Sequence, residues 1–101
     1  MWRLMAVYVD TMRAPFRGRV MCHMVADTEE ELHAMAARLG LLHRWHQKAG
    51  TPHSHYDIDM PTRALALLHG AREIRRRDLG LLIRRKRAAM AHDALAVSGR
   101  P

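Results

Sequence analysis

The feature that most constrains the fold is the segment 20–40, "VMCHMVADTEEELHAMAARLG", in which an apolar run passes directly into a helix start. The run 20–26 has the length and composition of a buried strand. Asp27 or Thr28 can then cap a helix whose first turn carries three glutamates, because carboxylates interact favourably with the positive end of the helix dipole. Apolar residues follow at the spacing of one buried helical face. We therefore predict a helix over about 28–39.

The same alternation of strand and helix continues along the chain. A second helix is expected from Pro61, with Asp59 as its cap, and a third from Arg76 or Arg77. This order predicts an α/β fold, a small single-domain layer arrangement with a mixed sheet of about four short strands and three helices. The first two helices should cover one face of the sheet. The expected strands are 4–10, 20–26, 55–59 and 71–74.

The segments between and after these elements complete the prediction. Residues 11–19 contain Pro15 and Gly18 and are expected to form a loop. This loop is too short for a parallel crossover, so the first two strands are expected to be antiparallel, which separates Asp10 and Asp27 to opposite ends. We expect one domain at 5–89, an N-terminal extension at 1–4 and a frayed C-terminal tail at 90–101.

Helical spacing also predicts which faces of the last two helices are buried. In the second helix the buried side chains are expected to be Ala64, Leu65 and Leu68. In the third helix the apolar stripe consists of Leu79, Leu82 and Ile83, followed by an exposed basic end. That end is "RRKR" at 84–87.

The size and composition of the chain exclude several classes of protein. With 101 residues it has room for one domain and one core. A single cysteine, Cys22, excludes an internal disulfide, and its apolar neighbours predict a buried thiol in a reducing compartment. No apolar run is long enough to span a bilayer, and the N-terminus lacks the features of a signal peptide. We expect a cytoplasmic protein with no membrane partner.

The net charge of +7 is concentrated in the last third of the chain. Residues 71–101 carry nine of the 17 basic side chains and three of the ten acidic ones. Within them, 72–87 holds eight Lys or Arg in sixteen residues. Such a segment is either a solvated helix face or a surface that attracts nucleic acid, nucleotides or an acidic protein. The candidate nucleic-acid contacts are Arg76, Arg77, Arg84, Arg85 and Arg87.

The stretch "TPHSHYDID" at 51–59 alternates histidines and carboxylates. In a strand, residues two apart share a face, so His55 and Asp57 would lie side by side. Two imidazoles and a carboxylate suit a divalent metal, and the same groups can act as acid and base. A plain polar strand end followed by a cap at Asp59 is the alternative. Pro52 places His53 in the preceding loop. We therefore predict no metal ligand and no cofactor, and keep a divalent metal as an alternative.

Other polar residues could complete such a site. His23 interrupts an apolar strand, so it is either a hydrogen-bonded core histidine or a residue facing the same cleft as His55. Asp10 follows the first strand, and His33 lies at the edge of the first helical face. Trp45, among polar neighbours, could stack on a base or fill the core.

The assembled motifs resemble a family of small bacterial and phage proteins catalogued as domain of unknown function 4031. The matching pieces include "MAVYVD" (5–10), "MCHMVADTEEELHAMAARLG" (21–40), "HYDID" (55–59) and "LIRR" (82–85), and together they cover about 5–87. The resemblance implies a compact, frequently phage-associated single domain and supplies no activity. It singles out polar residues inside the motifs. These are Asp10, Arg13, His23, Asp27, His33, Arg44, Trp45, His55, Asp57 and Arg63.

Two functional hypotheses follow, and whether the protein is an enzyme stays open. In the first, a His/Asp/Arg cleft binds or processes a phosphate-containing ligand, a nucleotide or nucleic acid. Its catalytic candidates are His55, His23, Asp57 and Asp10, and its ligand-binding candidates are Arg13, Arg63, Arg44, Trp45 and His33. In the second, the protein is a non-enzymatic factor that binds a host protein or nucleic acid through its basic third helix. The sequence does not predict an oligomeric state.

Overall fold

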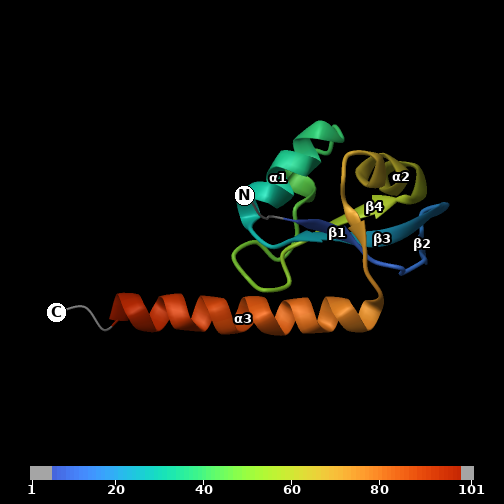
Figure 1. Ribbon diagram of the computed structural model, residues 1–101. Coiled ribbons are helices and arrows are strands. Elements are labelled where there is room, and N and C mark those ends of the chain that lie inside the picture. Colours follow the sequence, from blue (N-terminus) through green and yellow to red (C-terminus); the bar gives the residue numbers. More distant parts are fainter. Residues whose placement is uncertain (1–5, 99–101) are drawn as a thin grey trace.

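The computed structural model describes residues 6–98, and in it a mixed sheet separates two layers of helices (Figure 1). The α/β prediction is confirmed, with five strands rather than about four. The strands are β1 (Val7–Val9), β2 (Ala14–Phe16), β3 (Arg19–Ala26), β4 (Tyr56–Asp59) and β5 (Arg72–Glu73). The helices are α1 (Glu29–Arg38), α2 (Met60–Leu68) and α3 (Arg76–Ser98), with a short 3₁₀ turn, η1 (His43–Trp45).

Strand β3 organises the sheet, because three other strands pair with it. β1, β2 and β4 all run antiparallel to it. β4 pairs with one edge of β3, and β1 and β2 pair with successive parts of the other edge. Met24 lies between Val9 of β1 and Tyr56 of β4, and Met21 lies between Ala14 of β2 and Asp59 of β4. β5 then pairs in parallel with β1. The predicted antiparallel arrangement of the first two long strands is confirmed.

The alternation of side chains along β3 divides the molecule into a core face and an open face. Cys22, Met24 and Ala26 are buried against α1 and α2, which lie together on the upper side in Figure 1. His23 points the opposite way, as does its directly paired neighbour Asp57. α3 runs along this second side. The polar residues of the strands are therefore separated from the core.

Helix α1 forms where the sequence predicts it. The Thr28 hydroxyl accepts a hydrogen bond from the Glu31 backbone N–H at 3.2 Å and donates to the Glu31 carboxylate at 2.8 Å, which closes the N-terminus. Leu32, Met35 and Ala36 are buried in the core. A cap and a buried stripe in the correct phase explain why this element was predictable.

Helix α2 begins as predicted but presents a different face. Asp59 accepts a hydrogen bond from the Thr62 backbone N–H at 3.0 Å and caps the helix. The expected buried face is wrong: Leu65 and Leu68 are exposed, and Ala66 is the buried residue. Arg63, on the same side as Ala66, donates from Nε to the Asp10 carbonyl at 3.2 Å. This contact between α2 and the end of β1 fixes the rotation of the helix.

The predicted loop at 11–19 contains a strand. β2 pairs with β3 through a turn in which Arg17 and Gly18 both adopt positive φ, 50° and 77°. Pro15 sits in this strand, which is compatible with its position at the end of the sheet. A three-residue strand with a proline gives no periodic signal, so the sequence did not reveal it.

Helix α3 is longer than the sequence predicts. Its stripe is confirmed, because Leu82 is buried and Leu79 and Ile83 are half-buried. Lys86, expected to be exposed, is buried instead. Residues 90–98, expected to be a frayed tail, are helical and extend beyond the sheet (Figure 1). That part has no core to face, which accounts for its missing periodicity. The proposed extension at 1–4 and the end of the tail, 99–101, lie outside the described residues.

Two further expectations concern the thiol and the membrane. Cys22 is buried as predicted, and burial raises its pKa to about 11, so the thiol stays protonated at neutral pH. In the part of the chain from 6 to 98, none of the helices combines the length and hydropathy of a membrane span.

Candidate functional site

Three polar side chains gather on the open face of the sheet, and we call them the open-face cluster: His23, His55 and Asp57. Asp57 Oδ1 lies 3.4 Å from His55 Nε2 and 3.9 Å from His23 Nε2. The two imidazole rings meet edge to face, with centroids 5.1 Å apart. Register places them together, because His23 pairs with Asp57 across β3 and β4 and His55 precedes β4. The expected proximity of His23 and His55 is thus observed.

Asp10 supports His23 from the end of β1. Its Oδ2 lies 2.7 Å from His23 Nδ1, and its Oδ1 accepts from the backbone N–H groups of His23 (2.9 Å) and Met12 (3.3 Å). The residue is 1% exposed. Burial opposes ionisation of Asp10, but the bonds from His23 outweigh it and its pKa falls below 3.8. The same bond to Asp10 raises the pKa of His23 above 6.5, against the effect of burial.

His55 and Asp57 each have a second partner as well. His55 Nδ1 lies 2.7 Å from the carbonyl oxygen of His53. Gln47 donates from Nε2 to Asp57 Oδ2 at 2.8 Å. Gln47 is held opposite His55 by two backbone hydrogen bonds of 2.9 and 3.1 Å. The loop that leads into β4 therefore folds back and orients both side chains.

Two cavities meet at the open-face cluster. The larger is an open cleft of about 1090 Å³ that reaches His23 and Asp57, and its rim carries the guanidinium groups of Arg17, Arg19 and Arg44. Phe16 and Trp45 add aromatic surface to this cleft. The smaller, about 170 Å³, lies between the cluster and α3, and His23, His55, Leu79 and Ile83 are among its lining residues.

The structure separates other predicted site residues from this cleft. Arg63 ion-pairs with Glu73 besides its bond to Asp10, and its side chain is 13% exposed, so it braces α2 and β5. Arg13 places Nη1 3.7 Å from Met60 Sδ on α2. Neither guanidinium lines the larger cleft, whereas the predicted Arg44 and Trp45 do.

The arginines of α3 are exposed, whereas Lys86 is buried. Arg85 Nη2 is 3.1 Å from Asp27 Oδ1, and Tyr8 donates its hydroxyl to the same carboxylate. Arg87 Nη2 is 3.1 Å from His53 Nε2. These contacts attach α3 to the rest of the domain. Arg76, Arg77 and Arg84, the other predicted nucleic-acid contacts, are exposed.

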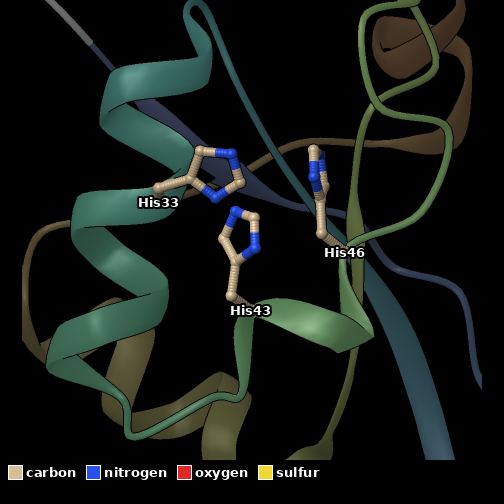
Figure 2. Close-up of side chains that lie close together, drawn as sticks. All are labelled: His33, His43 and His46. Carbon is tan, nitrogen blue, oxygen red and sulfur yellow. The ribbon is translucent and has the colours of Figure 1, made fainter.

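A second histidine cluster lies on the core side of the sheet, beside α1, and we call it the core-side cluster: His33, His43 and His46 (Figure 2). His33 comes from α1, His43 from η1 and His46 from the residue after it, and their rings face one another. The ring centroid of His33 is 4.5 Å from each of the others. The sequence singled out His33 alone. In the sequence, the separation of His43 and His46 by three residues was the signal that could have pointed to this cluster.

Hydroxyl groups and a carboxylate partner the core-side cluster. His33 Nδ1 is 3.0 Å from the Tyr56 hydroxyl, and His46 Nε2 is 2.6 Å from the Ser54 hydroxyl. Glu29 Oε2 lies 3.4 Å from His46 Nε2. The His46 side chain is 6% exposed, and desolvation lowers its pKa below 6.5 despite the nearby Glu29.

Either cluster could hold a metal ion by proximity alone. In each, three residues offer one ligand atom apiece within 4.8 Å of one another. Imidazole and carboxylate groups are ordinary ligands of divalent transition metals. Proximity therefore does not choose between the two clusters, and the hydrogen-bond partners must.

Comparison with known proteins gives a family and no relative of known activity. No curated protein and no solved structure matches the chain. One family model, described as "Protein of unknown function (DUF4031)", matches residues 7–89. This range contains both clusters and all five strands. The chain therefore belongs to this family of proteins of unknown function.

Proposed function

We propose that the larger cleft, which His23 and Asp57 of the open-face cluster line, binds a phosphate-containing ligand, a nucleotide or the end of a nucleic acid. The observation that carries the proposal is the combination of a structured His/Asp centre with a cleft bordered by three guanidinium groups. Guanidinium groups bind phosphate oxygens in bidentate geometry, and aromatic rings stack on bases.

The contacts support a division of roles within the cleft. Arg17 and Arg44 are exposed at its rim, and Arg19, 69% exposed, makes an ion pair of 3.3 Å with Asp59. Trp45 is 49% exposed beside Arg44, so its ring is free to stack on a planar group. The rim therefore supplies charge and stacking surface, and the open-face cluster lies where the phosphate end of the ligand would reach.

The test is a binding titration with a fluorescent nucleotide and with a short single-stranded oligonucleotide carrying a terminal phosphate. We expect Arg44→Ala to weaken binding about tenfold, which corresponds to about 1.4 kcal/mol. Arg72→Ala is the matched control, because Arg72 is exposed on β5 at the opposite edge of the sheet. Equal affinities for the two variants, or no binding of either probe by wild type, would refute the proposal.

A second candidate function rests on α3. Its arginines are exposed, and its second half extends beyond the sheet, where a partner could contact it from several sides (Figure 1). In this alternative the protein is a phage-associated factor that binds a host protein or nucleic acid without catalysis. Binding should then weaken steeply with salt. Reversing the charge of Arg77 and Arg84 should abolish it, and Arg44→Ala should not.

A further inference from the structure

The hydrogen bonds of the open-face cluster define which ring nitrogens carry protons. His55 Nδ1 faces the His53 carbonyl, which can only accept, so this nitrogen carries the proton. His23 Nδ1 lies 2.7 Å from Oδ2 of the Asp10 carboxylate, whose other oxygen already accepts two backbone N–H groups, so this nitrogen also carries the proton. In both neutral rings the free lone pair is therefore on Nε2.

Both Nε2 atoms point at one carboxylate oxygen. Asp57 Oδ1 lies 3.4 and 3.9 Å from them, while its other oxygen, Oδ2, accepts from Gln47. Two lone pairs directed at a carboxylate oxygen repel it unless a proton or a metal cation lies between them. From this geometry we propose that His23, His55 and Asp57 bind one divalent transition-metal ion of the zinc type. This inference rests on the proposed function and identifies how the same site would hold its ligand.

The distances fit such an ion. A tetrahedral zinc with ligands at about 2.0–2.1 Å has neighbouring ligand atoms about 3.3 Å apart. The measured 3.4 Å already meets this value, and the 3.9 Å contact needs a small rotation of the His23 ring. Three ligands leave one position open, as in catalytic rather than structural zinc sites. That position can take a phosphate oxygen, because His23 and Asp57 both line the larger cleft.

Each ligand also has the partner that a metal site requires. Asp10 holds the His23 ring, the His53 carbonyl holds His55, and Gln47 holds Asp57. Such partners fix the tautomer and orientation of the ligands and raise their basicity. The core-side cluster also has a carboxylate, since Glu29 Oε2 lies 3.7 Å from His33 Nε2 and 3.4 Å from His46 Nε2. Its rings, however, face hydroxyl groups that can donate as well as accept, so each Nε2 can carry a proton and donate it to Glu29 with no metal ion between them. Cys22 is not a competing ligand, because it is buried on the other face of β3.

The test uses the full-length protein after chelator treatment, titrated with Co²⁺ and then Zn²⁺. We expect one equivalent of Co²⁺ to give the visible absorption of a four-coordinate site, and Zn²⁺ to displace it. His55→Ala and Asp57→Asn should each weaken binding more than the about 10- to 100-fold typical of losing a ligand's hydrogen-bond partner. Asp10→Asn should fall within that range. His43→Ala, in the core-side cluster, is the matched control and should bind as wild type does.

The outcomes separate this inference from the proposed function. No saturable metal binding by protein with native circular dichroism, or binding removed by His43→Ala and retained by His55→Ala, overturns the metal site. The arginine-dependent binding of nucleotide is measured separately on metal-free protein, so it can survive that result. Asp57→Asn preserves the shape of the side chain. The circular dichroism spectrum of this variant shows whether it still folds, and therefore whether a loss of metal binding comes from the missing ligand or from unfolding.

Discussion

The two histidine clusters lie on opposite faces of one sheet and differ in the partners of their rings. In the open-face cluster, Nδ1 of each histidine faces an acceptor, the Asp10 carboxylate or the His53 carbonyl. In the core-side cluster, the Tyr56 hydroxyl faces His33 Nδ1 and the Ser54 hydroxyl faces His46 Nε2, and the Glu29 carboxylate lies beside Nε2 of both rings. Acceptors fix a tautomer, and hydroxyls adapt to either one. Both clusters bring three potential ligand atoms together, so the groups that face the rings are the reason why we propose a metal at the open-face cluster.

The electrostatics of the clusters also differ. The bond to Asp10 raises the pKa of His23, and desolvation lowers the pKa of His46. The first histidine is therefore stabilised in its charged form by the negative charge of Asp10. The second is stabilised in its neutral form. We interpret the core-side cluster as a hydrogen-bonded network that attaches the loop before β4 to α1.

Tyr56 lies between the clusters, and its removal should have the largest effect. The residue is 1% exposed, its ring stacks on His46, and its hydroxyl meets His33. Truncating a buried aromatic ring typically costs about 3–5 kcal/mol. We expect Tyr56→Ala to lower the free energy of unfolding by that amount in denaturant titrations. It should also impair metal binding, because His55 and Asp57 flank it in the sequence.

Tyr56→Phe keeps the ring and serves as the control. It removes only the hydroxyl, so the cost should be about 1 kcal/mol, the value of one hydrogen bond. Metal binding at the open-face cluster should be unchanged. Equal losses of stability for the two substitutions would contradict the role given to the ring.

Asp10→Asn tests the open-face cluster alone. The substitution retains the size of the side chain but replaces one acceptor oxygen by a donor, which cannot pair with the proton on His23 Nδ1. An unsatisfied buried polar group costs about 1–3 kcal/mol, and we expect a loss in that range from thermal and denaturant unfolding. A variant as stable as wild type would mean that His23 turns to another acceptor. The core-side cluster should keep its ring contacts, visible as unchanged His33 and His46 resonances in NMR spectra.

The pH dependence of stability tests the core-side cluster. In the unfolded chain His46 takes up a proton near pH 6.5, and in the folded protein only at lower pH, because burial disfavours its charge. Between these two values the unfolded state binds more protons, so stability is lost as the pH falls below 6.5. The contribution of neutral His46 to the free energy of unfolding is fully present above pH 6.5. Denaturant midpoints measured from pH 7.5 to 5 contain this loss, and the comparison with a variant that lacks the His46 titration isolates it.

His46→Gln removes the titration and is compared over the same pH range. Its midpoint should fall less steeply as the pH decreases, although it starts lower because the bond to Ser54 is altered. The raised pKa of His23 acts in the opposite direction, but it is common to both proteins and cancels in the difference. Parallel profiles for the two proteins would remove His46 as the source of the pH dependence.

The sequence predicted the parts of the site that depend on alternation within strands. His55, directly before β4, and Asp57, within it, are two apart, and His23 points away from its apolar neighbours in β3, so their common face followed from spacing. The contact between His23 and Asp10 required the register of β1 against β3, which spacing does not give. The three histidines of the core-side cluster come from a helix, a 3₁₀ turn and a loop, so no single period relates them.

The errors in the fold have a related cause. α1 was predicted correctly, because its cap and its buried stripe agree. α2 was assigned the wrong face, because its rotation is set by Arg63 reaching Asp10 and Glu73 rather than by its leucines. Arg63, which the family resemblance singled out as a candidate for anion binding, pairs with Glu73 in the structure. Where a tertiary polar contact competes with hydrophobic spacing, the sequence pattern alone favours the leucines.

The smallest effect is expected for His43, the exposed member of the core-side cluster. Its ring contacts His33 at 4.5 Å and His46 at 5.9 Å between centroids, while those two rings have hydrogen-bond partners of their own. Substitution of an exposed residue usually changes stability by less than about 0.5 kcal/mol. We expect His43→Ala to stay within this range in denaturant titrations. His92→Ala, which alters an exposed histidine on α3 outside both clusters, gives the baseline. The metal site would move to the core side if His43→Ala lost much more stability than this baseline and if added Zn²⁺ stabilised wild type but not His43→Ala. A hydrogen-bonded network alone would gain no stability from the ion.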